Sequence, residues 1–196
     1  MSENTNLQDT INNSAQTIVN LKNQSSKINK SIDLIINTIK KNNNIFICGN
    51  GGSASQAEHF STEFLVRLNK KINRDPIPII PLVFNNSHLT ACANDYSFNE
   101  IFSKTLKGIG NKNDCLIALS TSGESKNIIE VLKLSKKMAI NSIGFFGLKK
   151  NIVTSANINI FVENSDTARI QEAHLFLGHF ILNEVEKKLL KKKIIK

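Results

Sequence analysis

The sequence predicts an α/β domain built on a parallel five-stranded sheet with helices on both faces, and three observations carry this prediction. Five short runs rich in Ile, Val and Phe are apolar at nearly every position, which is typical of parallel strands buried on both faces. Amphipathic helical stretches separate these runs, so right-handed crossovers are expected between neighbouring strands. A chain of 196 residues, of which 40% are hydrophobic, supplies enough core for one such domain.

A helical extension precedes the first strand. Residues 5–41 are expected to form one or two amphipathic helices, with an apolar stripe made of Ile28, Ile32, Leu34, Ile35, Ile36 and Ile39. This arm packs either on another subunit or on its own sheet, and the sequence leaves both possibilities open. We therefore expect a single domain over residues 1–196, with the helical arm at 1–41 and the α/β core at 42–196.

Strands and helices alternate through the core. Strands are expected at 45–48, 77–84, 115–119, 142–146 and 158–162. Helices are expected at 53–68, 87–93, 98–106 and 125–139, with a long final helix at 168–190. Because ligands of open parallel sheets bind beyond the carboxyl ends of the strands, the loops that follow the strands are the places to look for function.

The charge and composition limit the function classes. The net charge of +9 arises largely from six lysines within residues 187–196, where cations complement the dipole of a solvated helix end. A weak site for nucleic acid or an anionic surface is the alternative, but the chain has no Trp and one Tyr for base stacking. No apolar run reaches 18 residues and no secretory leader is visible, so we expect no membrane span. Three Cys residues without disulfide or metal spacing indicate a reducing cytoplasm.

The loop after the first expected strand is rich in glycine. Gly49, Asn50, Gly51 and Gly52 precede Ser53, so the backbone can approach a ligand closely at the N-terminus of the next helix. The spacing matches neither the dinucleotide nor the P-loop fingerprint. The plain alternative is a tight strand–helix turn capped by Ser.

Two further loops point to the same edge of the sheet. The loop over 119–125 holds four hydroxyl side chains, more than a helix cap needs, and this predicts an anion site formed by Ser120, Thr121, Ser122 and Ser125. Asn94 and Asp95 are ordinary turn residues on their own. They follow the second expected strand, however, and so can reach the same rim.

Two pairs of polar residues on helices suggest proton transfer or metal binding. His59 and Glu63 lie four apart on one helix face, and Gln171 and His179 lie about 80° apart on the final helix. If the two faces meet, they form either a four-ligand divalent site that favours zinc or an acid–base pair. A solvated helix face is the plain alternative. His174 and His88 are expected to be structural, as are the three Cys residues.

Together these motifs resemble the bacterial phosphoheptose isomerases, which are sugar-isomerase (SIS) domain proteins acting on sedoheptulose 7-phosphate. The resemblance is carried by Gly49–Ser53, His59 with Glu63, Asn94 with Asp95, the hydroxyl loop, and the Arg-Ile-Gln-Glu stretch that His179 follows. It runs in order through nearly the whole chain. It implies a doubly wound, flavodoxin-like SIS fold, a homotetramer with sites shared between subunits, and a cytoplasmic role in supplying heptose for lipopolysaccharide or capsule.

The resemblance also implies roles for single residues. It assigns phosphate binding to Ser120, Thr121, Ser122 and Ser125, beside Asn50, Gly51, Gly52 and Ser53, and sugar contacts to Asn94 and Asp95. It assigns the acid–base pair to Glu63 and His179. It implies one zinc ion per subunit, held by His59, Glu63, Gln171 and His179, with Gln171 also near the substrate. A Glu63 held tightly by zinc would be a poorer base, and the sequence leaves this tension open.

One position departs from the family pattern, and one related group has another role. Some family members have Asp immediately before the Arg-Ile-Gln-Glu stretch, where this chain has Ala168. The DnaA-binding replication regulators share the Gly-rich turn but typically lack the residues that match Glu63 and His179. This chain has both, which favours an enzyme over a regulator or a module that only binds sugar phosphates.

Overall fold

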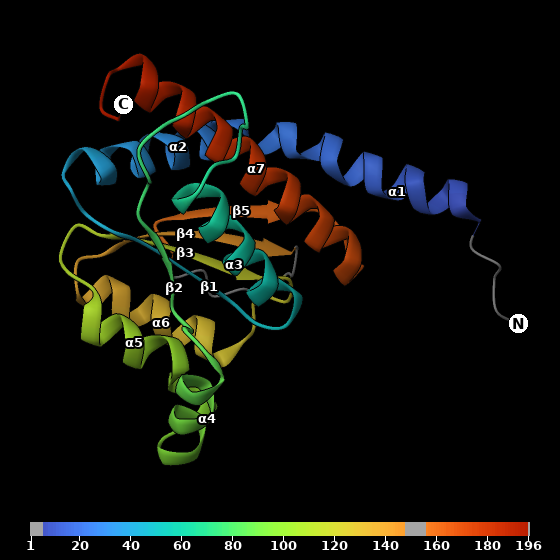
Figure 1. Cartoon of the computed structure of the whole chain (residues 1–196). Helices are drawn as coiled ribbons and strands as arrows, with labels where there is room; N and C mark the ends of the chain where they lie inside the picture. The colour runs from blue at the N-terminus through green and yellow to red at the C-terminus, as the bar shows by residue number, and fades with distance from the viewer. Residues whose placement is uncertain (1–5, 148–155, 196) are drawn as a thin grey trace, which may run out of the picture.

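The computed structural model describes residues 6–147 and 156–195, and these form a three-layer α/β sandwich (Figure 1). The central sheet has five strands, all parallel to their neighbours, in the order β2-β1-β3-β4-β5. The strands are β1 (Ile45–Gly49), β2 (Ile79–Pro81), β3 (Cys115–Ser120), β4 (Asn141–Gly147) and β5 (Ile158–Val162). This is the doubly wound, flavodoxin-like order, in which the chain changes direction across the sheet between β1 and β3.

Helices cover both faces of the sheet, as expected. One face is covered by α2 (Ser25–Lys40), α3 (Gly52–Leu65) and α7 (Thr167–Lys191), which share one apolar core with the sheet. The other face is covered by α5 (Ile101–Ile109) and α6 (Lys126–Lys137), which share a second core. The remaining core helix is α4 (Asn86–Asp95), and a short 3-10 turn, Phe98–Glu100, leads into α5.

The N-terminal arm consists of α1 (Leu7–Asn20), a 3-10 turn (Leu21–Gln24) and α2. The predicted stripe on α2 is buried against α7 and the sheet, except that Leu34 is only partly covered. The arm therefore packs on its own subunit, which is one of the two possibilities that the sequence left open. Helix α1 runs along α7 and extends beyond the sheet (Figure 1).

The strand β2 is shorter than the predicted span of 77–84. Only Ile79–Pro81 pairs with β1, at the edge of the sheet. Pro78 and Pro81 carry no N–H to donate to a ladder, so this segment cannot pair over its full length. Ile77 and Leu82 are nevertheless fully buried, which explains why the run is apolar beyond the paired residues.

Among residues 6–147 and 156–195, no helix combines the length and the hydropathy that crossing a bilayer requires.

Candidate functional site

The Gly-rich turn lies at the carboxyl end of β1, next to the point where the sheet order reverses. Gly51 has a φ of 55°, in the left-handed region that favours glycine. A Cβ on Gly49 would lie 2.6 Å from the backbone oxygen of Ser53, so the chain can double back here only without a side chain. Ser53 is buried inside the turn. The turn thus places backbone N–H groups of the first turn of α3 at the open edge of the sheet.

The hydroxyl loop follows β3 and is folded by its own side chains. The Ser120 hydroxyl accepts from the Gly123 N–H at 3.0 Å and lies 3.4 Å from the Ser125 hydroxyl. The Ser122 hydroxyl accepts from the Glu124 N–H at 3.1 Å. Ser125 occupies the N-cap position of α6 without a capping bond from its side chain. The first N–H groups of α6 and several hydroxyls therefore face the same rim, an arrangement suited to an anion.

A reciprocal amide pair joins the two loops. The Asn50 side chain donates to Asn127 Oδ1 at 2.9 Å, and the Asn127 side chain donates to Asn50 Oδ1 at 2.8 Å. Asn127 is buried in the first turn of α6. The Gly-rich turn and the hydroxyl loop are thereby held side by side, as the shared sheet edge predicts. Asn127 is not among the residues predicted from the sequence, because a lone Asn at the start of a helix has no distinctive spacing.

The polar residues of α3 and α7 meet, which confirms that these two helix faces come together. The Nε2 atoms of His59 and His179 lie 2.7 Å apart, with the rings edge to face. The Glu63 carboxylate lies 3.8 Å from His59 Nε2. Burial lowers the pKa of His179, and nearby His59 lowers it further, while Glu63 opposes the shift. The cluster therefore has a carboxylate and imidazoles within reach of one proton path.

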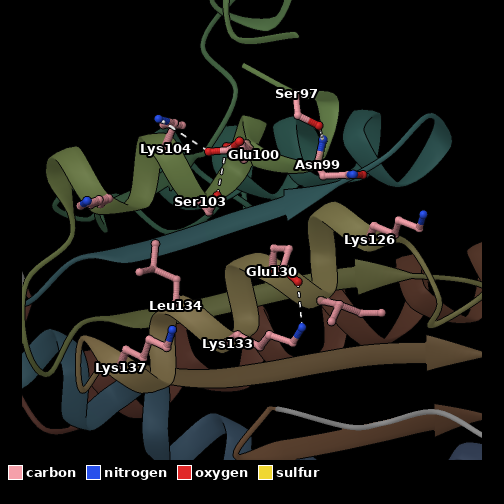
Figure 2. Close-up of a pocket in the computed structure, with 12 residues that line it drawn as sticks. Ser97, Asn99, Glu100, Ser103, Lys104, Lys126, Glu130, Lys133, Leu134 and Lys137 are labelled. Carbon is pink, nitrogen blue, oxygen red and sulfur yellow. Dashed lines mark hydrogen bonds and ion pairs between the residues drawn. The ribbon is translucent and has the colours of Figure 1, made fainter. Parts of the chain in front are cut away.

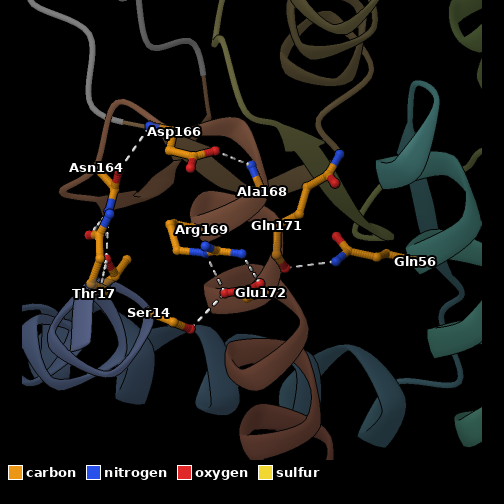
Figure 3. Close-up of polar contacts among 10 residues, drawn as sticks. Ser14, Thr17, Gln56, Asn164, Asp166, Ala168, Arg169, Gln171 and Glu172 are labelled. Carbon is orange, nitrogen blue, oxygen red and sulfur yellow. Dashed lines mark hydrogen bonds and ion pairs between the residues drawn. The ribbon is translucent and has the colours of Figure 1, made fainter. Parts of the chain in front are cut away.

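Gln171 lies at the other end of this helix pair. A Cβ on Gly52 would lie 2.6 Å from Gln171 Nε2, so the amide covers the Gly-rich turn. The Gln171 backbone oxygen accepts from the Gln56 side chain at 2.7 Å, which fixes this turn of α7 against α3 (Figure 3). The arrangement brings His59, Glu63 and His179 together and places Gln171 by the turn that leads into α3.

The start of α7 is held by a polar network (Figure 3). Asp166 caps the helix by accepting from the Ala168 N–H at 2.8 Å. Arg169 donates to Glu172 at 2.7 Å, and Ser14 of the arm donates to the same carboxylate at 2.6 Å. The bond from Arg169, helped by that from Ser14, lowers the pKa of Glu172. Ala168, at the position where some family members carry Asp, presents no polar side chain. Asp166 lies two residues earlier and caps the helix instead.

Asn94 and Asp95 lie apart from these groups. They are the last residues of α4, they are exposed, and the Asn94 amide donates to the Asp95 carboxylate at 2.9 Å. The sequence predicts a turn at these residues after a helix at 87–93, whereas in the structure they still belong to that helix, α4. Their contact with a sugar stays a prediction.

Two hollows lie near the site. A hollow of about 200 Å³ adjoins the Gly-rich turn and is lined by the ends of β1 and β2 with α3 and α5. A groove of about 710 Å³ between α5 and α6 is lysine-rich, and its Lys126 directly follows the hydroxyl loop (Figure 2). Glu100 and Glu130 pair with Lys104 at 3.6 Å and Lys133 at 2.8 Å. None of the site residues predicted from the sequence lines this groove.

The remaining histidines and the cysteines are structural, as expected. His174 is fully buried beside Phe145, and burial lowers its pKa to about 4. His88 Nε2 forms a hydrogen bond of 2.9 Å with the Thr105 hydroxyl. All three thiols are buried, and burial raises the pKa of Cys115 to about 12. His174 and the three thiols therefore lack the exposure that nucleophilic or metal chemistry requires.

The parallel sheet, the switch point and the loops at its carboxyl edge define a doubly wound α/β domain, and the family model described as the SIS domain matches residues 9–147. The chain belongs to the SIS domain family and, within it, to the phosphoheptose isomerases. It is 41% identical to the phosphoheptose isomerase of Campylobacter concisus over 78% of this chain and 80% of that protein. It is 36% identical to the Clostridium acetobutylicum phosphoheptose isomerase over 86% of this chain and 85% of that protein.

Solved structures agree with the sequence relatives. The phosphoheptose isomerase from Francisella tularensis superposes with a TM-score of 0.80 at 25% identity, covering 93% of this chain and 100% of that one. The phosphoheptose isomerase from Neisseria gonorrhoeae superposes with a TM-score of 0.78 at 27% identity, with the same coverage. The fold and the family expected from the motifs are therefore confirmed.

Proposed function

We propose that this chain is an aldose–ketose isomerase that converts D-sedoheptulose 7-phosphate to D-glycero-D-manno-heptose 7-phosphate through an enediolate. The observation that carries the proposal is the meeting of His59, Glu63 and His179 between α3 and α7. The same helix α3 begins at the Gly-rich turn, which the Asn50–Asn127 pair joins to the hydroxyl loop. Membership of the phosphoheptose isomerases supports the same substrate.

The phosphate end is assigned to the two loops. Ser120, Thr121, Ser122 and Ser125 offer hydroxyls and helix N–H groups, and the turn formed by Asn50, Gly51, Gly52 and Ser53 flanks them. Gln171, which covers the turn, and the Asn94–Asp95 pair are assigned to the sugar. Binding the non-reacting phosphate holds the far end of the substrate, and this binding energy positions the reactive carbons.

The proton chemistry is assigned to Glu63 and His179. Glu63 takes the proton from C1 of the ketose, which leaves an enediolate, and returns a proton to C2. His179 moves the hydroxyl protons between O1 and O2, so the carbonyl shifts from C2 to C1 without any net change of atoms. A His of lowered pKa is neutral at pH 7, and a neutral imidazole can both accept and donate a proton.

We also propose zinc as the cofactor, with His59, Glu63 and His179 as its ligands. The fourth ligand that the resemblance implies is Gln171, whose amide lies over Gly52 in this structure. Two Nε2 atoms 2.7 Å apart share a proton, and a zinc ion bound to both at about 2.0–2.1 Å would hold the two rings farther apart. Imidazole with carboxylate is nevertheless a ligand set that zinc accepts. Within the described residues, no three His, Cys, Asp or Glu side chains are already arranged around a common point. The fit therefore rests on ligand type and closeness. When bound, zinc would polarise the carbonyl and stabilise the enediolate.

The assembly and the setting extend the proposal. We propose a homotetramer that works in the cytoplasm and supplies heptose for lipopolysaccharide or capsule. Val19 on α1 and Phe176 and Phe180 on α7 are more than 40% exposed and line a groove of about 360 Å³ between the arm and α7. An apolar surface of this kind beside His179 supports contact between subunits at the site. Neither nucleic acid nor membrane is assigned as a partner.

The direct test is incubation of the purified protein with sedoheptulose 7-phosphate, with the aldoheptose 7-phosphate identified by NMR. Turnover at enzymic rates is the expected result. Tight binding of the ketose phosphate without turnover would instead favour a non-catalytic SIS module, such as a sugar-phosphate sensor or a DnaA-binding regulator. The Glu63→Gln variant is the control: product that forms equally fast with this variant does not come from the assigned catalytic base.

A further inference from the structure

Arg74 forms a buried ion pair outside the site described above. It lies in the segment between α3 and β2, and its Nε donates to the carboxylate of Glu186 on α7. The two side chains are only 1% and 2% exposed. Nothing in the sequence singles out either residue, because 112 positions separate them. The pair is therefore a long-range link between the segment after α3 and the C-terminal part of α7.

The rest of the guanidinium group holds the end of α3. Nη2 donates to the backbone oxygen of Glu63 at 2.9 Å, and Nη1 donates to that of Phe64 at 2.8 Å. Both oxygens belong to the last turn of α3, where carbonyl groups lack partners within the helix. A cation at this end also complements the helix dipole. Arg74 thus caps α3 at the residue to which the proton transfer is assigned.

The same pair fixes α7 relative to α3. Glu186 lies seven residues after His179. The two side chains therefore point in directions only about 20° apart around the axis of α7 and lie about 10 Å apart along it. Arg74 therefore ties the backbone of Glu63 to the helix face that carries His179. The Arg74 guanidinium and the Glu186 carboxylate are therefore placed to set the distance between Glu63 and His179.

We infer that Arg74 and Glu186 are positioning residues for Glu63 and His179, an inference that rests on the proposed isomerase. Neither residue touches a reacting atom; they act through the backbone of α3 and the face of α7. Stability alone explains the pair poorly, since a buried ion pair is often no more stable than apolar side chains of similar volume. Within the described residues, Glu186 Oε1 also has no hydrogen-bond partner, which adds a cost to burying this carboxylate.

The first test uses Arg74→Lys and Glu186→Gln. Lysine keeps the charge but cannot bridge the carboxylate and both carbonyls, and glutamine keeps the shape but loses the charge. For each variant we expect kcat to fall about 10- to 100-fold while KM for sedoheptulose 7-phosphate stays within about three-fold, since a small misplacement costs about that much rate. The matched control is Glu130→Gln, which removes a surface ion pair on α6 and should change neither constant. Parent kcat in both variants, or a rise in KM alone, would overturn the inference.

The second test separates position from stability. The double variant Arg74→Met/Glu186→Leu replaces the ion pair by apolar side chains, so it should melt at or above the temperature of the single variants. We expect its kcat to stay as low as theirs, because the Glu63 carbonyl has lost the guanidinium donor that holds it. Recovery of kcat together with stability would show that the pair is only structural.

A third readout does not depend on turnover. In protein labelled with 15N-histidine, the imidazole signals of His59 and His179 report the contact between their Nε2 atoms. These signals should shift in Arg74→Lys and stay unchanged in Glu130→Gln. Unshifted signals in Arg74→Lys would overturn the inference even if the parent lacked isomerase activity. An inactive parent with shifted signals would overturn only the proposed function.

Discussion

Gly178 is the contact point between α7 and α3, next to His179, and replacing it by Ala tests the packing that builds the site. A Cβ at this position would lie 2.1, 2.4 and 2.7 Å from three atoms of the Phe60 ring. Ordinary contacts of this kind are about 3.5–4.0 Å long. Phe60 is 2% exposed, so its ring cannot turn out into solvent. The two helices must therefore move apart or the ring must leave its rotamer.

The magnitude follows from two opposing terms. Replacing Gly by Ala inside a helix stabilises by about 0.5–1 kcal/mol, whereas overpacking a tight core costs about 1–3 kcal/mol. With a contact this short the cost prevails, and we expect Gly178→Ala to lower the free energy of unfolding by about 1–2 kcal/mol. We also expect a loss of kcat, because His179 follows directly in the chain.

The assay is urea unfolding at one protein concentration, with Gly108→Ala as the matched control. Gly108 is also helical, on α5, and a Cβ there meets nothing within 4 Å. This control should gain about 0.5–1 kcal/mol, so the same substitution should have opposite signs at the two sites. Equal or greater stability of Gly178→Ala relative to the parent would refute the argument that close helix packing builds the site.

The remaining predictions concern His174, the phosphate loop and the metal. The folded-state pKa of His174 is about 4, below its ordinary value of 6.5, so the unfolded state binds the proton first as the pH falls. The unfolding free energy should therefore drop by about 3 kcal/mol between pH 6.5 and pH 4, and His174→Leu should remove most of that slope in urea titrations. Ser122→Ala and Ser125→Ala should each raise KM about ten-fold or more with little change in kcat, since each removes a hydrogen bond to a charged group. Steady-state kinetics measures both constants, and an unchanged KM in both variants would place the phosphate elsewhere. His59→Ala should contain less zinc, as measured by elemental analysis, and should lose part of its activity, which added zinc partly restores. His179→Ala should stay inactive when zinc is added. Full activity in zinc-free parent protein would show that the reaction does not need the metal.

Local patterns predicted most of the fold. Four of the five strands agree with the expected spans within two residues, because continuous apolar runs bounded by polar loops leave little choice. The strand β2 was predicted too long, since Pro78 and Pro81 limit pairing in a segment that is still buried. Helix α3 ends at Leu65 rather than at 68, where the Arg74 guanidinium caps it. This cap comes from a distant side chain and leaves no local signal.

The site was predictable only in part, for the same reason. The turn and the hydroxyl loop are local motifs, and helix spacing placed His59 with Glu63 on one face. Whether that face meets His179 depends on the packing of α3 against α7 at Gly178, which helix periodicity does not specify. The Asn50–Asn127 and Arg74–Glu186 links join distant parts of the chain and also required the structure.

The central claim is that Glu63, with His179, moves a proton between C1 and C2 of the sugar phosphate. Its most direct test is the reaction of sedoheptulose 7-phosphate in deuterium oxide, followed by NMR for the parent and for Glu63→Gln. The parent should form the aldose with deuterium at C2, because the carboxyl proton exchanges with solvent in the course of transfer. Glu63→Gln should remain folded and be about 10²–10⁴-fold slower, the usual cost of losing a general base. Isomerisation by Glu63→Gln within a few-fold of the parent rate would contradict the account.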